Sequence, residues 1–107
     1  CTVNTMGKLA NGLCDNLLTN TAIAWDYKKP LVIAPACNTY MWDNLMTKRH
    51  VSVLTGLGVK IVPPVEKTLA CGDTGVGAMA SISSICGRVF AANLIKEKFG
   101  ATSNTSK

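Results

Sequence analysis

The chain contains few of the residues that mark several common classes of protein. Its 107 residues include one histidine and only two each of Trp, Tyr and Phe, and no Cys-x-x-Cys pair occurs. No apolar run approaches the ~18 residues that cross a membrane, so we predict no membrane span. One histidine and no cysteine pair predict no zinc site, and no other metal site is indicated. The eleven Lys and Arg residues are scattered and the aromatics are few, so we expect no nucleic acid partner despite a net charge of +5.

The five cysteines form an odd set without a disulfide-framework spacing. Free thiols are typical of a reducing compartment, so we expect a cytoplasmic protein. Cys14 and Cys86 lie in helical patterns and fit small buried apolar residues. The single imidazole, His50, lies beside Lys48 and Arg49, and we predict a solvated surface residue there rather than a catalytic base.

Apolar periodicity and turn residues predict an alternating α/β order. We predict helices over residues 5–25, 43–57 and 82–99, strands over 31–34 and 59–62, and a long loop over 65–81. This order favours right-handed crossovers and a parallel sheet. Two strands do not make a self-sufficient sheet of this kind. We therefore expect residues 1–100 to be the carboxyl-terminal part of a larger domain, and residues 101–107 to be a disordered tail.

A loop rich in amide, sulfur and aromatic groups follows the first predicted strand. It runs over residues 34–42 and contains Asn38, whose amide can donate two hydrogen bonds to a carboxylate without titrating. Ligands of open α/β sheets sit outside the carboxyl ends of the strands, so this loop suits a small-molecule site. The alternative is a turn in which Asn38 bonds its own backbone.

Two further features carry chemistry. Cys71 lies in a glycine-rich stretch, and an ordinary thiol is mostly protonated at neutral pH, as a general acid toward a carbanion must be. An incidental cysteine in a glycine-rich turn is the alternative. Asn4 and Thr5 begin the first predicted helix, where backbone amides favour phosphate, although either residue also suits an ordinary N-cap.

Three segments, in order and with suitable spacing, resemble the motifs of one family. Residues 3–10 (VNTMGKLA) resemble its ANT-x-GK segment, residues 35–42 (PACNTYMW) its P-x-M-N-x-x-M-W motif, and residues 69–73 (LACGD) with 75–79 its substrate-clamp motif. The chain thus resembles the flavin-dependent cysteine decarboxylases, which include the halotolerance flavoproteins. The resemblance covers roughly residues 1–98.

The resemblance implies a Rossmann-like (flavodoxin-like) FMN-binding domain with a parallel sheet and helices on both faces. It also implies a homotrimer or heterotrimer with active sites between subunits. The implied reaction removes CO2 from 4′-phosphopantothenoylcysteine to give 4′-phosphopantetheine in coenzyme A biosynthesis. In that reaction the flavin oxidises the thiol side of the substrate, which makes loss of CO2 feasible, and then returns the electrons.

The resemblance also assigns roles to residues. Asn38 would hold the substrate carboxylate, and Cys71 would be the proton donor. The cofactor would be lined by Thr2, Val3, Asn4, Thr5 and Ala36, and the substrate would also contact Met41, Thr68, Ala70 and Met79. The family's catalytic histidine lies upstream of these motifs, so a companion N-terminal segment is expected to carry it. Cys37 stands where the family usually has Met, and Thr68 where relatives often have a basic residue.

Two other functions fit part of this pattern. Some fungal relatives regulate a protein phosphatase, so the chain would then be a non-catalytic or partly catalytic halotolerance-type subunit. A peptide-cysteine decarboxylase of the lantibiotic type is the third candidate. The residues around Cys71 fit the coenzyme A enzyme better.

Overall fold

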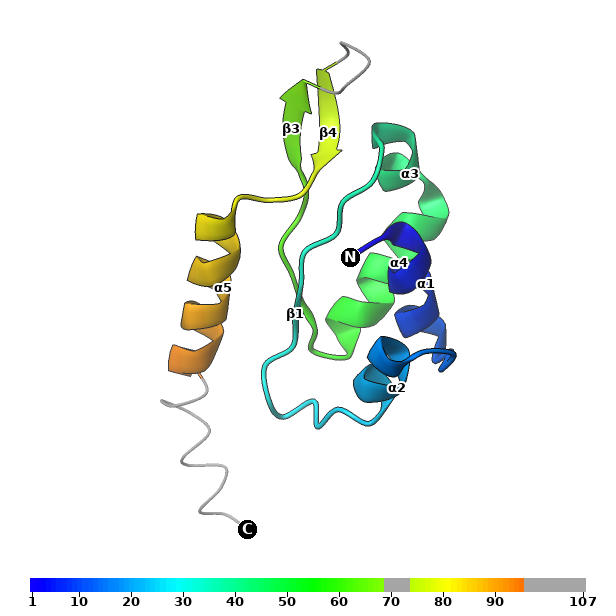
Figure 1. Cartoon of the computed structure of the whole chain (residues 1–107), viewed down its shortest axis with the longest axis vertical. Helices are drawn as coiled ribbons and strands as arrows, with labels where there is room; N and C mark the ends of the chain where they lie inside the picture. The colour runs from blue at the N-terminus through cyan, green and yellow to red at the C-terminus, as the bar shows by residue number, and fades with distance from the viewer. Residues whose placement is uncertain (69–73, 96–107) are drawn as a thin grey trace.

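Helices alternate with short strands along the chain (Figure 1). The computed structural model describes residues 1–68 and 74–95. In chain order the elements are α1 (Val3–Asn11), α2 (Leu17–Ile23), β1 (Val32–Ile33), α3 (Thr39–Asp43), α4 (Leu45–Gly56), β2 (Lys60–Ile61), β3 (Val65–Thr68), β4 (Thr74–Ala78) and α5 (Ile82–Ile95).

The strands β1 and β2 form a parallel pair, as the apolar runs predict. Val32 aligns with Lys60 and Ile33 with Ile61. The amide of Lys60 donates to Leu31 O, and that of Val62 to Ile33 O, both at 2.9 Å. Helices α3 and α4 form the crossover between the two strands.

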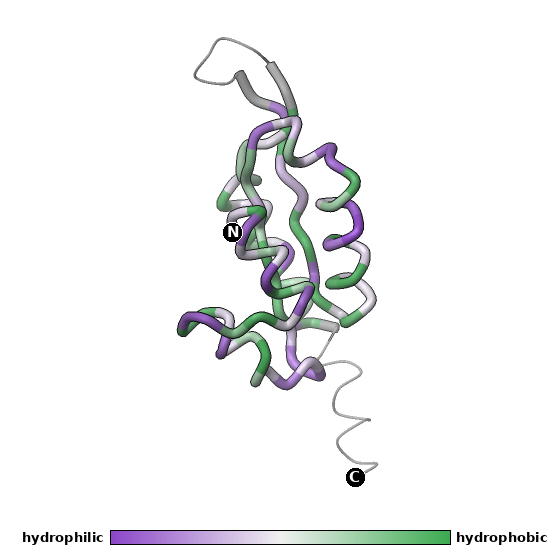
Figure 2. Tube along the Cα trace, turned by 90° about the vertical axis from the view of Figure 1, so that its right-hand side faces the viewer, coloured by the Kyte–Doolittle hydropathy of each residue, from purple (hydrophilic) through white to green (hydrophobic). Residues whose placement is uncertain are grey.

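The core lies between the parallel strands and the helices α1 and α4. Met6, Leu54 and Val59 are almost fully buried and contact one another, and half-buried side chains from β1 and β2 pack against them. Helix α5 lies on the other side of the strands from α1 and α4 (Figure 1). Apolar (green) and polar (purple) segments are interspersed along the helices (Figure 2). A parallel strand pair with helices on both sides is the predicted α/β fold class, which is confirmed.

The single helix predicted over residues 5–25 is wrong, because the chain breaks it into α1 and α2. Gly12 takes φ +70°, and the amide of Leu13 donates to Lys8 O at 3.0 Å, a Schellman-type end for α1. Asn16 then begins α2, with its side chain accepting from Thr19 N at 2.8 Å. Cys14 therefore lies in the connection and is exposed, contrary to the buried helical position we predicted.

The helix predicted over residues 43–57 is confirmed as α4, which begins at Leu45 and ends at Gly56. Asn44 has extended backbone, with ψ 142°, and its side chain accepts from Met46 N at 2.8 Å, so it caps a new helix, α4. The preceding residues form the short helix α3. The loop predicted to follow the first strand is therefore partly helical.

The long loop predicted over residues 65–81 is wrong as well. Strands β3 and β4 pair antiparallel as a hairpin, with Thr68 aligned with Thr74. Glycines in β4 conceal the strand pattern, since glycine is depleted in strands. Glu66 aligns with Val76 but Val65 with Ala78, so the register skips Gly77 and leaves a bulge there.

The last helix begins at residue 82 as predicted, and α5 is described as far as Ile95. Its predicted continuation to residue 99 and the predicted tail over 101–107 lie outside the described residues. Cys86 is exposed on α5 and not buried as expected. Of the helices described, none combines the length and the apolar character that a bilayer crossing requires.

Candidate functional site

The site begins where β1 ends. The backbone nitrogen of Cys1 donates to Ala34 O at 3.2 Å, and the amide of Ala36 donates to Cys1 O at 2.9 Å. This alternation is that of a parallel ladder, so the residues entering α1 lie beside the loop that leaves β1. The structure thereby brings Thr2, Val3, Asn4 and Thr5 to the neighbourhood of Ala36, as the resemblance implies.

The first turn of α1 presents polar groups at this edge. Thr2 Oγ1 accepts from Thr5 N and donates to Thr5 Oγ1, both at 3.1 Å. The amides of Val3 and Asn4 form no hydrogen bond within residues 1–68 and 74–95. Because unpaired amides and the positive end of the helix dipole favour negative charge, this turn suits a polar or anionic ligand group.

Asn38 lies at the start of α3, where its side chain fits both the turn interpretation and the ligand-binding interpretation. Its Oδ1 accepts from Met41 N at 2.9 Å, the capping bond that the turn interpretation predicts. That bond uses the carbonyl side of the amide. The residue is exposed, and in the described part of the chain its Nδ2 group has no acceptor. The cap therefore fixes the side chain while the donor side remains available for a carboxylate.

Cys37 joins this loop to the hairpin through its backbone. Its amide donates to Gly77 O at 2.9 Å, so β4 lies directly against the loop that carries Asn38. Burial raises the pKa of the Cys37 thiol, and the carboxylate of Asp43 raises it further. The thiol thus stays protonated at neutral pH and acts as a partly buried apolar group.

The predicted substrate contacts are only partly described. Met41 and Met79 expose 47% and 50% of their surface, which leaves each thioether accessible to a ligand. Met41 lies on α3, and Met79 directly follows β4. Thr68 ends β3, but its side chain, Ala70 and the proposed proton donor Cys71 lie outside what the structure describes. Residues 69–73 connect β3 to β4 in sequence. Strand β4 in turn contacts the Asn38 loop.

One polar group near this loop was missed in the sequence. The hydroxyl of Thr39, next to Asn38, is buried and has no hydrogen-bond partner within the described residues. Buried hydroxyls are usually paired, so an unpaired one next to a candidate site is a reason to expect a ligand atom there. Its only signal was its place in the 35–42 motif.

His50 is not the solvated surface residue we predicted. It is half-buried, and its ring lies against α1: a Cβ on Gly7 would come within 3.2 Å of His50 Cε1. His50 Nε2 lies 3.4 Å from Asn11 Nδ2, and no described residue is paired with the buried Nδ1. Gly7 therefore lets α1 approach α4. The ring packs between the two helices.

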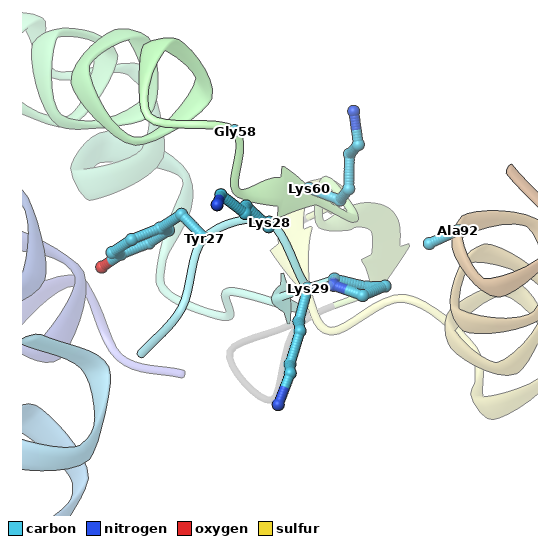
Figure 3. A pocket seen from close by; sticks show the side chains of 7 residues that line it. Tyr27, Lys28, Lys29, Gly58, Lys60 and Ala92 are labelled. Atoms are coloured by element: carbon cyan, nitrogen blue, oxygen red, sulfur yellow. The ribbon is translucent and has the colours of Figure 1, made fainter. Parts of the chain in front are cut away.

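A separate cavity of about 240 Å³ lies at the opposite end of the strands. It is lined by Tyr27, Lys28 and Lys29 from the turn before β1, by Lys60 and by Ala92 of α5 (Figure 3). The side chains of Lys29 and Lys60 point away from each other and not toward a common centre (Figure 3). The cavity contains none of the predicted site residues.

The fold and the site define an α/β protein with a candidate ligand site at the carboxyl end of its parallel strands. The family described as Flavoprotein matches residues 1–94, and the chain belongs to that family.

Relatives with known names share much of the sequence. A phosphopantothenoylcysteine decarboxylase of Arabidopsis thaliana is 53% identical over 102 residues, which is 94% of this chain and 49% of that protein. A solved PPC decarboxylase with a Cys-to-Ser substitution, complexed with pantothenoylaminoethenethiol, is 52% identical with a TM-score of 0.77 over 84% of this chain and 50% of that one. The FMN binding protein AtHal3 is 53% identical with a TM-score of 0.76, over 92% and 51%. The chain thus spans about half the length of these relatives.

Proposed function

We propose that the chain is the carboxyl-terminal part of an FMN-dependent decarboxylase that converts 4′-phosphopantothenoylcysteine to 4′-phosphopantetheine in coenzyme A biosynthesis. The observation that carries the proposal is the meeting of three segments at the end of β1. The first turn of α1 lies beside Ala36, and the Asn38 loop lies against β4 through the bond from Cys37 to Gly77. These are the three segments that carry the family motifs.

The residues present fit one side of a flavin. The unpaired amides of Val3 and Asn4 and the hydroxyl of Thr5 are donors of the kind that bind polar flavin edges, and Ala36, which has a small side chain, lies beside them. When bound, FMN would supply the two-electron chemistry that makes loss of CO2 feasible. A companion N-terminal segment would supply the catalytic histidine.

This chain's own residues would bind the substrate and move a proton. Asn38 would donate through Nδ2 to the substrate carboxylate while its Oδ1 stays bound to Met41 N. Met41, Met79, Thr68 and Ala70 would contact the remainder of the substrate. Cys71 would protonate the carbon left after CO2 departs. The aminoethenethiol held by the Cys-to-Ser variant of the solved relative supports this order, since an enethiol is what accumulates when that proton is not delivered.

The exposed apolar side chains support an assembly of several subunits, either a homotrimer or a heterotrimer with shared sites. Leu17 of α2 is 84% exposed, and Tyr40 and Leu45 near the Asn38 loop are 88% and 85% exposed. Large exposed apolar groups are typical of surfaces that contact further protein, here the remainder of the domain or another subunit. The described cysteines form no disulfide, which supports our proposal of a cytoplasmic protein.

The test is purification of the full-length protein and an assay with two substrates. The proposal predicts bound flavin, stoichiometric CO2 and phosphopantetheine from 4′-phosphopantothenoylcysteine, and no turnover of a peptide ending in cysteine. Cys71→Ser should still release CO2 in a single turnover but should accumulate the enethiol.

Three results would contradict the proposal or its parts. Turnover of the peptide alone would favour the lantibiotic type. Inhibition of a protein phosphatase without any decarboxylation would favour the regulatory subunit. Normal formation of phosphopantetheine by the Cys71→Ser variant would remove the role given to Cys71.

A further inference from the structure

The contact between Gly77 of the hairpin and the Asn38 loop involves backbone on both sides. An ideal Cβ placed on Gly77 would come well inside 3.0 Å of Cys37 O, within 3.2 Å of Cys37 C and within 3.3 Å of Asn38 C. Real Cβ atoms do not approach backbone that closely. Since none of these three atoms belongs to a side chain, no rotamer change relieves the clash. Any residue other than glycine at this position must therefore displace the loop, the strand or both.

Backbone conformation does not explain the glycine. Among the described glycines only Gly12 and Gly58 have positive φ, so an L-residue at position 77 would suffer no strain of its own. Gly77 is also buried. The requirement for glycine at this position comes from the close approach alone.

The bulge in β4 explains how the contact forms. The register skips Gly77 between the pairs Glu66–Val76 and Val65–Ala78, so this residue is released from the hairpin ladder. Its carbonyl accepts instead from the amide of Cys37 at 2.9 Å. The hairpin thereby hydrogen-bonds with the loop as though the loop were a third strand at that point.

The peptide group that a Cβ on Gly77 would displace is the one between Cys37 and Asn38. The carbonyl carbon of Asn38 is itself among the atoms a Cβ would meet, and Asn38 O accepts from Trp42 N at 3.0 Å while Asn38 Oδ1 caps α3. A shift of this peptide therefore moves the amide Nδ2 of Asn38. On the other side, Gly77 lies in β4, the strand that follows the Cys71 segment in sequence.

From this geometry we infer that Gly77 is a positioning residue that sets the distance between the carboxylate-binding amide of Asn38 and the hairpin that carries the proton donor. The inference rests on the proposed function. Gly77 touches no substrate. Its part is to allow a backbone approach that any side chain would widen.

The experiment compares Gly77→Ala with two glycine controls in the full-length holoenzyme. Gly58→Ala places a Cβ at φ +98° with open space around it, so it strains a turn at the opposite end of the strands and destabilises the fold. Gly87→Ala adds a Cβ within α5 that meets nothing within 4 Å. CO2 and phosphopantetheine are both measured per bound flavin in a single turnover, and KM is measured from steady-state release of CO2.

The inference predicts that Gly77→Ala lowers the ratio of phosphopantetheine to CO2 at least 10-fold and raises KM, with flavin content retained. Both controls should keep the wild-type ratio even where Gly58→Ala lowers the melting temperature. Replacing Cys37 by Gly in the Gly77→Ala background should not restore the ratio, because the clash is with backbone. An unchanged ratio in Gly77→Ala, or rescue by Cys37→Gly, overturns the inference.

A wild-type measurement keeps the test decisive if Gly77→Ala does not fold. Amide hydrogen exchange should show the Cys37 N–H as protected as the paired amides of β4, because the two segments open together. Exchange at the rate of an exposed loop amide would overturn the inference. Failure of the wild-type enzyme to release CO2 would instead refute the proposed function, and the exchange result would still stand.

Discussion

Asn38 is expected to separate stability from activity, because the two sides of its amide have different partners. Its Oδ1 caps α3 at 2.9 Å from Met41 N. Its Nδ2 is the group that we propose donates to the substrate carboxylate. Asn38→Asp keeps an acceptor for the cap and loses the donor. Asn38→Ala loses both. The two variants should therefore rank in opposite orders in the two measurements.

The expected magnitudes follow from the two bonds. Loss of a side-chain N-cap costs about 1 kcal/mol, and Asp is as good a cap as Asn. Asn38→Ala should therefore unfold about 1 kcal/mol more easily, and Asn38→Asp should be close to wild type. Loss of a hydrogen bond to a charged group costs about 1.5–3 kcal/mol, or roughly 10- to 150-fold in kcat/KM. Asn38→Asp should fall below Asn38→Ala, since its carboxylate also repels that of the substrate.

The assay pairs urea unfolding of the full-length protein with kcat/KM from CO2 release. The measurement must be made on flavin-loaded protein, so that loss of cofactor is not read as loss of substrate binding. If activity follows stability in both variants, or if Asn38→Asp retains wild-type kcat/KM, Asn38 is a helix cap and nothing more.

Three further predictions concern the rest of the chain. Leu54→Ala should lower the free energy of unfolding by about 2–5 kcal/mol, because Leu54 is 1% exposed. The control is Val53→Ala at a 40% exposed neighbour, which should change that free energy by about 0.5 kcal/mol or less. Equal urea midpoints for the two variants would place the core elsewhere. The Lys8 ammonium, 2.7 Å from Asp15 Oδ2, lowers the pKa of Asp15, so stability from this pair should be present above the carboxyl's unfolded pKa and be lost as pH falls through the lower folded value. In Lys8→Met, the pKa of Asp15 measured by NMR titration should be higher than in the wild type. Cys37 should react with iodoacetamide more slowly than the exposed thiols, since burial and a raised pKa both oppose it.

The alternating fold was predictable because its signals are local. Short apolar runs predicted β1 and β2, and the first residue of α5 followed from its pattern. The break at Gly12 was missed because apolar spacing continues across it, and the short helix α3 was missed because its start depends on a single capping side chain, that of Asn38. The hairpin was missed because glycines conceal its strand pattern, and one of them, Gly77, serves a close approach and not a turn.

His50 was misplaced for a different reason. Its sequence neighbours Lys48 and Arg49 are charged, but in a helix adjacent residues lie on different faces. The residues three before it and four after it, Thr47 and Leu54, are both buried. That spacing is the signal that places His50 toward α1. The positions of Asn38 and of the α1 start came from motifs, and their proximity required the pairing of Cys1 with the end of β1.

Because the Gly77 contact is made by backbone atoms, it limits substitutions at position 77 but not at position 37. A side chain at position 37 does not take part in the contact, so this position can exchange Met for Cys without altering the approach of the two segments. Position 77 has no such freedom. Natural variants should therefore differ at position 37 and keep glycine at position 77. Of the two positions, the one that has a side chain is thus the more variable.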